Sequence, residues 1–438
     1  MILNPTNALS WRRRLCGIAL PVLGALLLQT LGATASEPRR FPRIVNGLET
    51  SDFPATGALL YSSFGSMSSA PPVCTGTLIG CQTFLTAAHC FGLDDFNQDL
   101  DPSHYFIFLQ HAGFFAVDSI ALHPDYATVS GGVVTAWGDA FADVAVAHLS
   151  SAVTAIPPRP LLSSDPYALI PEGGSLAGTI AGFGLSGGGN DDLGLKRWGH
   201  VAVADCPTQI EGETVGEKLL CWEFANPIGA AGEDSNTCGG DSGGPLFFEI
   251  DGEVQVAGIT QAGSNFDCLP AGSIPDMSWD TSTYHYRSFI ETELGSDSTT
   301  TCGGLPDVGS ASAPILAFDG SLVSGGKSAE HSFAVGADTQ ALRVALNGID
   351  DGFFDPDLYL RRGAPATTSS YDCADLKATP LGYCAESNST QDTWYALIQN
   401  PGSGGGSYQL TVTQIPEPAA VLIGLFAIAT LGLARRSR

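Results

Sequence analysis

The stretch that most constrains this chain is residues 238–245, Cys-Gly-Gly-Asp-Ser-Gly-Gly-Pro. Four glycines surround the hydroxyl of Ser242, and glycine loses more conformational freedom on folding than any other residue. Such a run indicates backbone that turns tightly and leaves room for a second molecule. A plain glycine-rich turn is the alternative, because short motifs also occur by chance. The rest of the chain has to distinguish the two.

Composition favours β structure in more than one domain. The chain has 438 residues, enough for two or three domains at roughly 100–200 residues each. Its 53 glycines and 27 prolines, with few amphipathic helical runs, indicate strands joined by many turns. Residues 44–415 hold 10 basic side chains against 43 acidic ones. Such a surface repels phosphate backbones, so nucleic acid is not an expected partner.

The N-terminus predicts export and processing. Residues 1–36 have a basic start, an apolar run over 18–31 and a small-residue cleavage site, as a signal peptide does. A retained membrane anchor is the alternative, but the run is shorter than the ~20 residues that a span needs. Residues 37–43 are predicted to be a propeptide. A cut after Arg43 would create an amino group on Ile44, and Asp241 is a carboxylate without another obvious partner.

Three polar residues spread along the chain fit nucleophilic catalysis. His89 ends an apolar run, Asp143 begins one, and Ser242 lies among glycines. A hydroxyl is a poor nucleophile unless a base takes its proton and a third group orients that base. His89 alone would also suit a core histidine, and Asp139 is the rival acid, although no apolar strand follows it. Backbone N–H groups of Gly240 and Ser242 would bind the developing oxyanion.

The acidic stretch 94–101 is predicted to be an exposed loop. Calcium binding is the alternative, but the spacing fits no EF-hand pattern. No metal and no cofactor are expected.

Residues 44–294 resemble a trypsin/chymotrypsin-type serine peptidase. The resemblance implies an all-β fold of two six-stranded antiparallel β-barrels with a C-terminal helix and the active site between the barrels. It implies His89 as general base, Asp143 as its orienting acid and Ser242 as nucleophile, with the Ile44 amine pairing with Asp241 after the cut. The motifs that carry the resemblance are Ile-Val-Asn-Gly at 44–47, Leu-Thr-Ala-Ala-His-Cys at 85–90, Asp-Val-Ala-Val at 143–146 and Gly-Asp-Ser-Gly-Gly-Pro at 240–245.

The cysteines form an even set once Cys16, in the signal segment, is removed. Ten remain, as expected in an oxidising compartment. Two of the ten cysteines, one of them near the linker, belong neither to the family pattern nor to the second β unit, and we expect these two to pair with each other. The second β unit should hold a pair of its own. The resemblance implies Cys74–Cys90, Cys206–Cys221 and Cys238–Cys268, and the further pairs are Cys81–Cys302 and Cys373–Cys384.

The residues of the specificity pocket depart from the family pattern. Members that select Lys or Arg carry Asp six residues before the nucleophile, where this chain has the neutral Asn236. The usual Ser-Trp-Gly wall is replaced by Gln-Ala-Gly, ending at Gly263. Asp276, on the segment that closes the pocket, could supply a negative charge. Cleavage after basic residues is therefore open but not expected.

A second β-rich unit follows the peptidase-like part, which spans residues 44–302. Residues 303–314 are predicted to be a linker, and residues 315–415 a small β-sandwich. Residues 306–415 resemble a bacterial pre-peptidase C-terminal domain, on the segments 355–363, 368–373 and 394–395. Whether this unit binds substrate or aids secretion stays open.

The C-terminal segment 416–438 has Pro-Glu-Pro, an apolar run and an Arg cluster. It resembles a PEP-CTERM sorting signal, which implies sorting and processing machinery at the cytoplasmic membrane as a partner. A plain C-terminal anchor is the alternative. Either interpretation predicts a secreted or cell-surface bacterial protein, and the sorting signal also predicts a tail that is inserted in the membrane only transiently.

Together these features predict a secreted serine endopeptidase, made as a zymogen, that hydrolyses protein or peptide substrates through an acyl-enzyme. The alternative is a non-catalytic surface protein that keeps the peptidase fold for binding, with the sandwich as its adhesion module.

Overall fold

The computed structural model describes residues 44–91, 100–210, 212–326, 328–387 and 391–416. The predicted signal peptide, propeptide, most of the acidic loop 94–101 and nearly all of the C-terminal tail lie outside these residues. No helix in the described part of the chain is long and apolar enough to span a membrane.

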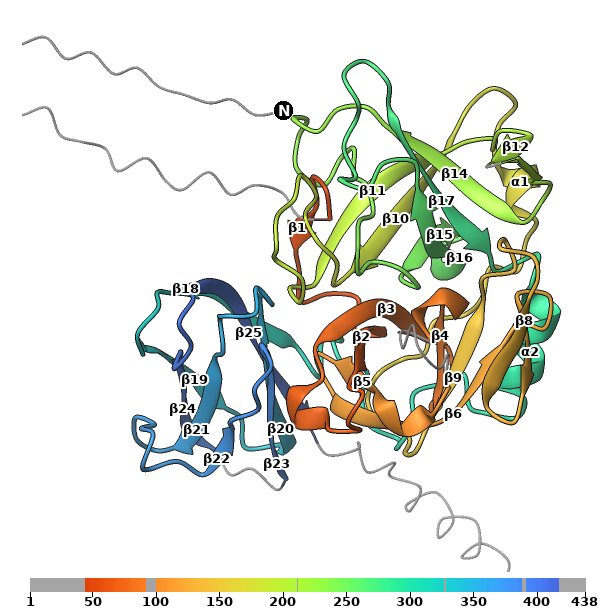
Figure 1. Cartoon of the computed structure of the whole chain (residues 1–438). Helices are drawn as coiled ribbons and strands as arrows, with labels where there is room; N and C mark the ends of the chain where they lie inside the picture. The colour runs from red at the N-terminus through yellow and green to blue at the C-terminus, as the bar shows by residue number, and fades with distance from the viewer. Residues whose placement is uncertain (1–43, 92–99, 211, 327, 388–390, 417–438) are drawn as a thin grey trace, which may run out of the picture. The chain divides into compact units, whose positions relative to one another are not determined.

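The all-β prediction is confirmed, with a closed barrel as the first unit (Figure 1). Its six strands pair in the order β2-β3-β4-β9-β6-β5, so β5 returns to β2 and no edge is left open. The strands are β2 Thr56–Tyr61, β3 Pro72–Leu78, β4 Thr83–Thr86, β5 Tyr105–Leu109, β6 Gly113–Leu122 and β9 Ala145–Leu149.

The second unit is a half-barrel formed by one sheet of seven strands, in the order β1-β11-β10-β15-β16-β17-β14. It differs from the expected second six-stranded barrel, because the ladder is not continuous around it. Strand β14 returns to the end of β11 through one bridge, between Ala204 and Cys221. The strands are β1 Leu48–Glu49, β10 Leu176–Gly182, β11 Arg197–Val203, β14 Leu219–Phe224, β15 Pro245–Ile250, β16 Glu253–Gly263 and β17 Asp276–Ser282.

Local sequence explains one hairpin turn of this second sheet and the end of the helix that follows it. Strands β15 and β16 join through Asp251 and Gly252, both with positive φ (53° and 83°), as a tight hairpin turn requires. The helix α2 Arg287–Leu294 is the expected C-terminal helix and ends at Gly295, where φ is 54°. The smaller elements are η1 Met67–Ser69, η2 Ala88–Cys90, η3 Pro102–His104, α1 Pro166–Leu169 and the ribbons β7 Ala127–Ser130 with β8 Val133–Trp137 and β12 Gln209–Ile210 with β13 Glu213–Thr214.

The C-terminal unit has two four-stranded antiparallel sheets, β18-β25-β20-β23 and β19-β24-β21-β22. Their facing side chains form one hydrophobic cluster, which includes Val344, Leu360 and Leu410. The strands are β18 Ile315–Leu322, β19 Ser328–Val335, β20 Thr339–Gly348, β21 Asp357–Arg362, β22 Cys373–Asp375, β23 Leu381–Ser387, β24 Asp392–Gln399 and β25 Gly406–Pro416.

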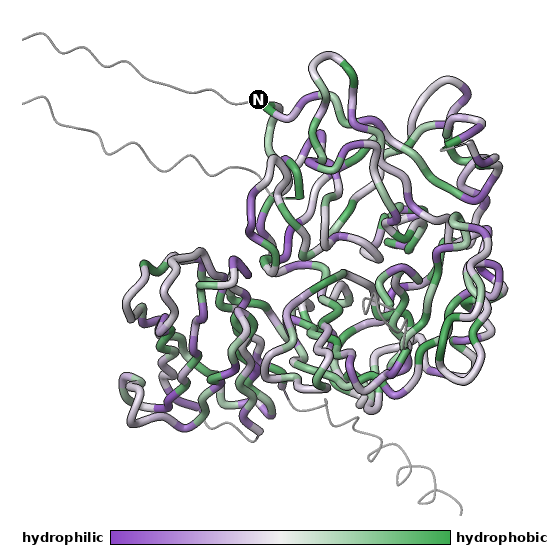
Figure 2. Tube along the Cα trace, viewed as in Figure 1, coloured by the Kyte–Doolittle hydropathy of each residue, from purple (hydrophilic) through white to green (hydrophobic). Residues whose placement is uncertain are grey.

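Strand β5 shows why the sandwich packs against the closed barrel. Its five residues, Tyr-Phe-Ile-Phe-Leu, are all buried, although successive side chains of a strand point to opposite faces. Tyr105, Ile107 and Leu109 belong to the barrel core. Phe106 and Phe108 belong to another cluster, which includes Ala345 and Leu381 of the sandwich. The continuous apolar run of β5 (green in Figure 2) therefore reflects burial on both faces.

Polar contacts join the same two units. Gln110 donates from Nε2 to Gln409 Oε1 and Thr411 Oγ1, both at 2.7 Å. Arg343 donates to the carbonyls of His111 and Thr154 at 3.0 and 2.9 Å. The predicted linker is also packed, since Val308 is 4% exposed and lies in the hydrophobic cluster of the closed barrel.

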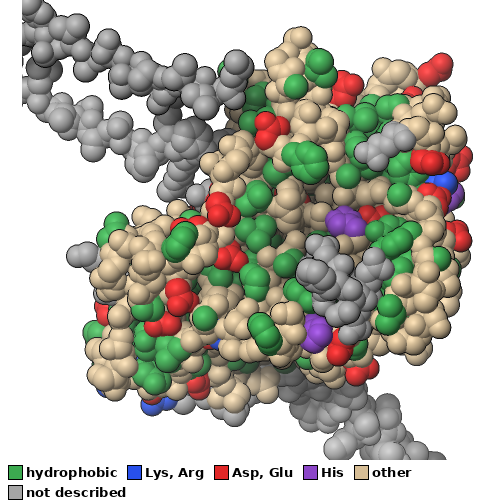
Figure 3. All heavy atoms as spheres, viewed as in Figure 1, with side chains coloured by type: hydrophobic (Ala, Val, Ile, Leu, Met, Phe, Trp, Pro, Cys, Tyr) green, Lys and Arg blue, Asp and Glu red, His purple; other side chains and the backbone are tan. Residues whose placement is uncertain are grey.

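The face in Figure 3 carries many Asp and Glu side chains and few Lys or Arg, as the composition indicates.

Candidate active site

His89 is held by the segment that follows β4. The apolar strand ends at Thr86, and the small buried residues Ala87 and Ala88 lead into the short helix η2, which contains His89. The imidazole Nδ1 lies 2.6 Å from Asp143 Oδ2, and the backbone N–H of His89 donates to Asp143 Oδ1 at 2.8 Å. Both oxygens of one carboxylate therefore orient the same histidine.

Asp143 lies two residues before β9, next to the buried Val144, and is itself only 2% exposed. The rival acid Asp139 lies elsewhere: it accepts from the Phe141 amide and pairs with Lys218 Nζ at 2.6 Å. The structure therefore brings Asp143, and not Asp139, to the imidazole.

The electrostatics suit His89 as a base. Burial alone would lower the pKa of His89, but the charge of Asp143 and its hydrogen bond outweigh burial and raise the pKa above 6.5. An imidazolium at this position is therefore stabilised relative to one without the acid.

Ser242 lies on a loop that packs directly against the His89 segment. Thr75 of β3 donates its N–H to the Ser242 carbonyl at 2.8 Å. Gly243 has a φ of 80°, and a Cβ there would lie 2.8 Å from the Ala87 amide nitrogen, so only glycine permits this approach. No hydrogen bond between His89 Nε2 and Ser242 Oγ occurs among the described residues; such bonds often tighten only when substrate binds.

Gly240 also needs glycine, since its φ is 90°. The turn around it is closed by the Asp241 amide, which donates to the Cys238 carbonyl at 2.9 Å. Within the described residues, the amides of Gly240 and Ser242 donate to no other backbone group outside the strands and helices. Neither amide is therefore bonded to a backbone partner in this turn.

Asp241 is 1% exposed and accepts from the backbone amides of Gly184 and Cys238 at 2.8 and 3.0 Å. Burial raises its pKa to about 7, while those amides and Arg197 oppose the rise. Ile44 is fully buried, and the next carbonyl, of Val45, accepts from the Asn236 amide at 3.0 Å. Arg43 lies outside the described residues, so the cut after it stays a prediction.

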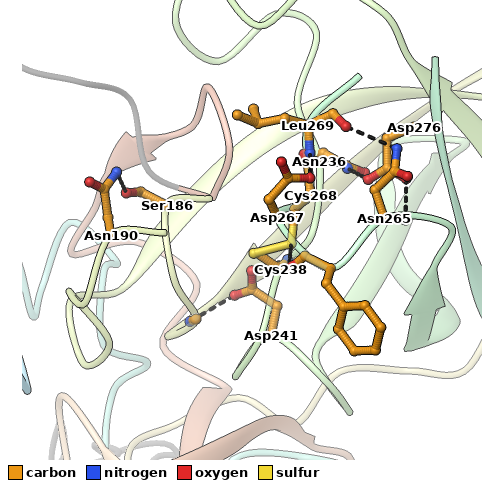
Figure 4. The surroundings of a disulfide bond; sticks show 12 residues. Ser186, Asn190, Asn236, Cys238, Asp241, Asn265, Asp267, Cys268, Leu269 and Asp276 are labelled. Carbon is orange, nitrogen blue, oxygen red and sulfur yellow. Dashed lines mark hydrogen bonds between the residues drawn. A yellow bond between two sulfur atoms is a disulfide. The ribbon is translucent and has the colours of Figure 1, made fainter. Parts of the chain in front are cut away.

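A cavity of about 440 Å³ opens beside Ser242, which lines it together with Thr260, Gly263 and Phe266, among others. Asn236 and Asp276 lie behind it and are almost fully buried. Asp276 accepts from Asn236 Nδ2 at 2.8 Å, Ser264 Oγ at 2.7 Å and the Asn265 amide at 2.9 Å (Figure 4). The hydrogen-bonding capacity of its carboxylate is therefore used by protein donors, and Asp276 is not among the residues that line the cavity.

Two buried charged residues near the site, Asp280 and Arg197, belong to none of the sequence motifs described above. Asp280 is 0% exposed and pairs in register with Thr260, one of the cavity-lining residues. Burial raises its pKa well above the ordinary value, the Thr260 hydroxyl opposes this rise, and the Asp241 charge adds to it. Arg197 is also 0% exposed and donates to the carbonyls of Gly184 and Asp192 at 2.6 and 3.1 Å. Strand alternation in β17 and β11 predicts burial at such positions, but not these partners.

The described cysteines form five disulfides, in the pairs that the sequence analysis expected. One of them, between Cys238 and Cys268 (Figure 4), lines the cavity beside Ser242. The pairs are Cys74–Cys90, Cys81–Cys302, Cys206–Cys221, Cys238–Cys268 and Cys373–Cys384.

One group of metal-ligand residue types, Cys74, His89 and Cys90, comes together within the described chain. Its two sulfurs are bonded to each other, and the thiolate is the form of cysteine that binds metals. The group therefore does not fit a metal.

The amino-acid sequence is similar to those of known serine peptidases. Residues 44–285 match the family described as Trypsin. Chymotrypsin-like elastase family member 1 of Rattus norvegicus is 27% identical over 250 residues, which cover 54% of this chain and 85% of that protein. Trypsin, alkaline C, of Manduca sexta is 28% identical over 236 residues, covering 51% and 83%. Chymotrypsin-C of Rattus norvegicus is 26% identical over 274 residues, covering 57% and 90%.

Proposed function

Because the chain belongs to the trypsin family of serine peptidases and is a serine endopeptidase, we propose that His89, Asp143 and Ser242 are its catalytic triad. The observation that carries the proposal is the 2.6 Å contact between His89 Nδ1 and Asp143 Oδ2, with the Ser242 loop packed against the residue two before His89.

The proposed reaction proceeds in two steps. His89 Nε2 accepts the proton of Ser242 Oγ as that oxygen attacks the carbonyl carbon of the scissile peptide bond. The protonated imidazole, held by Asp143, then gives its proton to the leaving amine, and an acyl-enzyme remains. Water, deprotonated by the same histidine, releases the acyl group. The amides of Gly240 and Ser242 stabilise the oxyanion, and losing one such donor costs about 3–4 kcal/mol of transition-state stabilisation.

A fluorophosphonate probe tests this assignment directly. Ser242 should become covalently labelled, and the Ser242→Ala protein should neither label nor cleave protein substrates. A folded parent chain that neither labels nor cleaves, even after a cut following Arg43, would favour the alternative of a non-catalytic binding protein.

We also propose that the enzyme is made as a zymogen. A cut after Arg43 would free the Ile44 amine, whose positive charge could then pair with the buried Asp241 carboxylate. Removing one member of a buried pair costs about 3–5 kcal/mol, so the uncut form should be nearly inactive. Full activity in an uncut Arg43→Gln protein would refute this.

For substrate preference, we propose a cavity that takes uncharged side chains. Asn236 is neutral, and Asp276 is already bonded to three protein donors.

For location, we propose a protein exported by residues 1–36, with residues 315–415 as a pre-peptidase C-terminal-like unit and residues 416–438 as a PEP-CTERM-like sorting segment. The five disulfides fit an oxidising, extracellular compartment.

A further inference from the structure

The segment of residues 191–195, here called the bridging segment, lies between β10 and β11 and contacts both the sandwich and the loop before Ser242. Its backbone pairs with the sandwich: the Asp350 N–H donates to the Leu193 carbonyl at 2.6 Å, in an antiparallel bridge just beyond β20. This bridge therefore holds the Leu193 backbone against the sandwich.

The side chain of Leu193 reaches the glycine that carries the proposed oxyanion donor. At Gly240, the atom nearest to an added Cβ would be Leu193 Cδ1, at a distance that no real side chain tolerates. The leucine methyl thus lies against the face of Gly240, on backbone with a φ of 90°. A glycine has no side chain of its own to hold its peptide planes, so a neighbouring contact limits their rotation.

The rest of the bridging segment is anchored in the sandwich. Leu195 is 1% exposed and belongs to the sandwich core cluster. Gly194 has a φ of 106°, and an added Cβ would lie 2.5 Å from the Gly348 carbonyl oxygen. The Gly194 amide donates to the Phe183 carbonyl at 2.8 Å, which ties the segment back to the peptidase.

A second path joins the sandwich to the same loop. Phe183 is fully buried in the cluster that contains Ala345 and Leu381 of the sandwich. The residue that follows it, Gly184, donates its amide to Asp241 at 2.8 Å. Asp241 lies between Gly240 and Ser242, so two separate sets of contacts lead from the sandwich to the nucleophile loop.

We propose that the C-terminal sandwich is part of the catalytic unit, and that Leu193 is a positioning residue that holds Gly240 in the conformation presenting its amide to the oxyanion. The inference rests on the proposed role of Gly240. Leu193 also borders a cavity of about 370 Å³ lined by Leu185, Gly239 and Asp350. Because that side of the leucine is not packed, its position depends on the backbone bridge to Asp350.

The test uses the full chain, cut after Arg43, and a peptide that the parent cleaves. Leu193→Ala should lower kcat by roughly tenfold or more with little change in KM, since small misplacement of catalytic groups is costly. Asp350→Pro, which removes the donating amide, should act in the same direction. Leu193→Met should recover most of the activity, because methionine can fill the same space. The milder Leu193→Val serves if the alanine variant does not fold.

Leu376→Ala is the matched control, because that sandwich leucine is 56% exposed. It should leave kcat unchanged. A kcat within twofold of the parent for folded Leu193→Val or Leu193→Ala and for folded Asp350→Pro would overturn the inference. That result would leave the triad standing, whereas loss of the proposed function would appear as a parent that is inactive or unaffected by Ser242→Ala.

Discussion

Asp143 binds His89 twice, through its backbone N–H at 2.8 Å and through Nδ1 at 2.6 Å. The bond to the backbone N–H holds the main chain of His89 in place, and the bond to Nδ1 fixes the plane and tautomer of the imidazole ring. Because Asp143 is 2% exposed, water does not compete for either oxygen. The acid therefore acts on the orientation of the base as well as on its pKa.

Asp143→Asn should lower kcat by roughly 10⁴-fold, because an amide NH₂ facing Nδ1 favours the wrong tautomer. The pKa of His89 is raised, and the base must be neutral, so parental activity falls as pH drops through that raised value. In the variant this acidic limb should move to lower pH. The measurement is kcat/KM against pH. Asp139→Asn is the matched control and should change neither, as Asp139 pairs with Lys218 at the surface.

Asp143 and the Cys81–Cys302 pair could be predicted from the sequence because of their chemistry. The position of Asp143 at the start of an apolar strand predicts burial, and burial distinguishes it from Asp139. The pairing of Cys81 with Cys302 could be inferred because the other cysteines had partners. A buried carboxylate and a cysteine in an oxidising compartment each need a partner, and this need limits where they can lie.

Contacts between distant aliphatic residues could not be predicted in the same way. Leu193 lies in a Gly- and Asp-rich stretch, and nothing in its type indicates that it touches Gly240 or that its backbone pairs with Asp350. The all-apolar β5 predicts a strand covered on both faces, but leaves the covering element unnamed. Asp276 could be placed near the pocket, whereas its three donors depend on the folded loop.

The stability of the uncut protein should fall between about pH 4 and pH 7. Burial raises the pKa of Asp241 to about 7, from 3.8 in the unfolded chain. In that window the folded protein holds a proton that the unfolded chain has lost, so rising pH favours unfolding. In the inactive Ser242→Ala background, denaturant unfolding at pH 5 and pH 8 measures the difference. Asp241→Asn should reduce it, and an unchanged difference would contradict the assignment.

Asp276→Asn should leave the cleavage preference unchanged. The carboxylate is 1% exposed and already accepts three hydrogen bonds, so it offers no free oxygen to a basic side chain in the cavity. Stability should fall by about 1–3 kcal/mol, because an amide cannot accept from all three donors. A peptide library cleaved by parent and variant checks the preference. A parental preference for Lys or Arg that disappears in the variant would show Asp276 to be the selecting charge.

Removing the Cys81–Cys302 disulfide should destabilise the protein more than removing Cys373–Cys384. The first bridge closes 221 residues of sequence and the second only 11, and the unfolded chain gains more freedom when the longer loop is released. Each should contribute roughly 2–4 kcal/mol. Paired alanine variants of each bridge, compared by denaturant unfolding under oxidising conditions, give the two values.

Asp297 should reduce the stability lost with the Cys81–Cys302 bridge. It accepts from the Gln82 amide and the Thr83 hydroxyl at 2.7 and 2.8 Å, and so joins the same two segments as the bridge. Adding Asp297→Ala to the Cys81→Ala/Cys302→Ala variant should therefore cost more than Asp297→Ala in the parent, and equal costs would show that the two ties act independently.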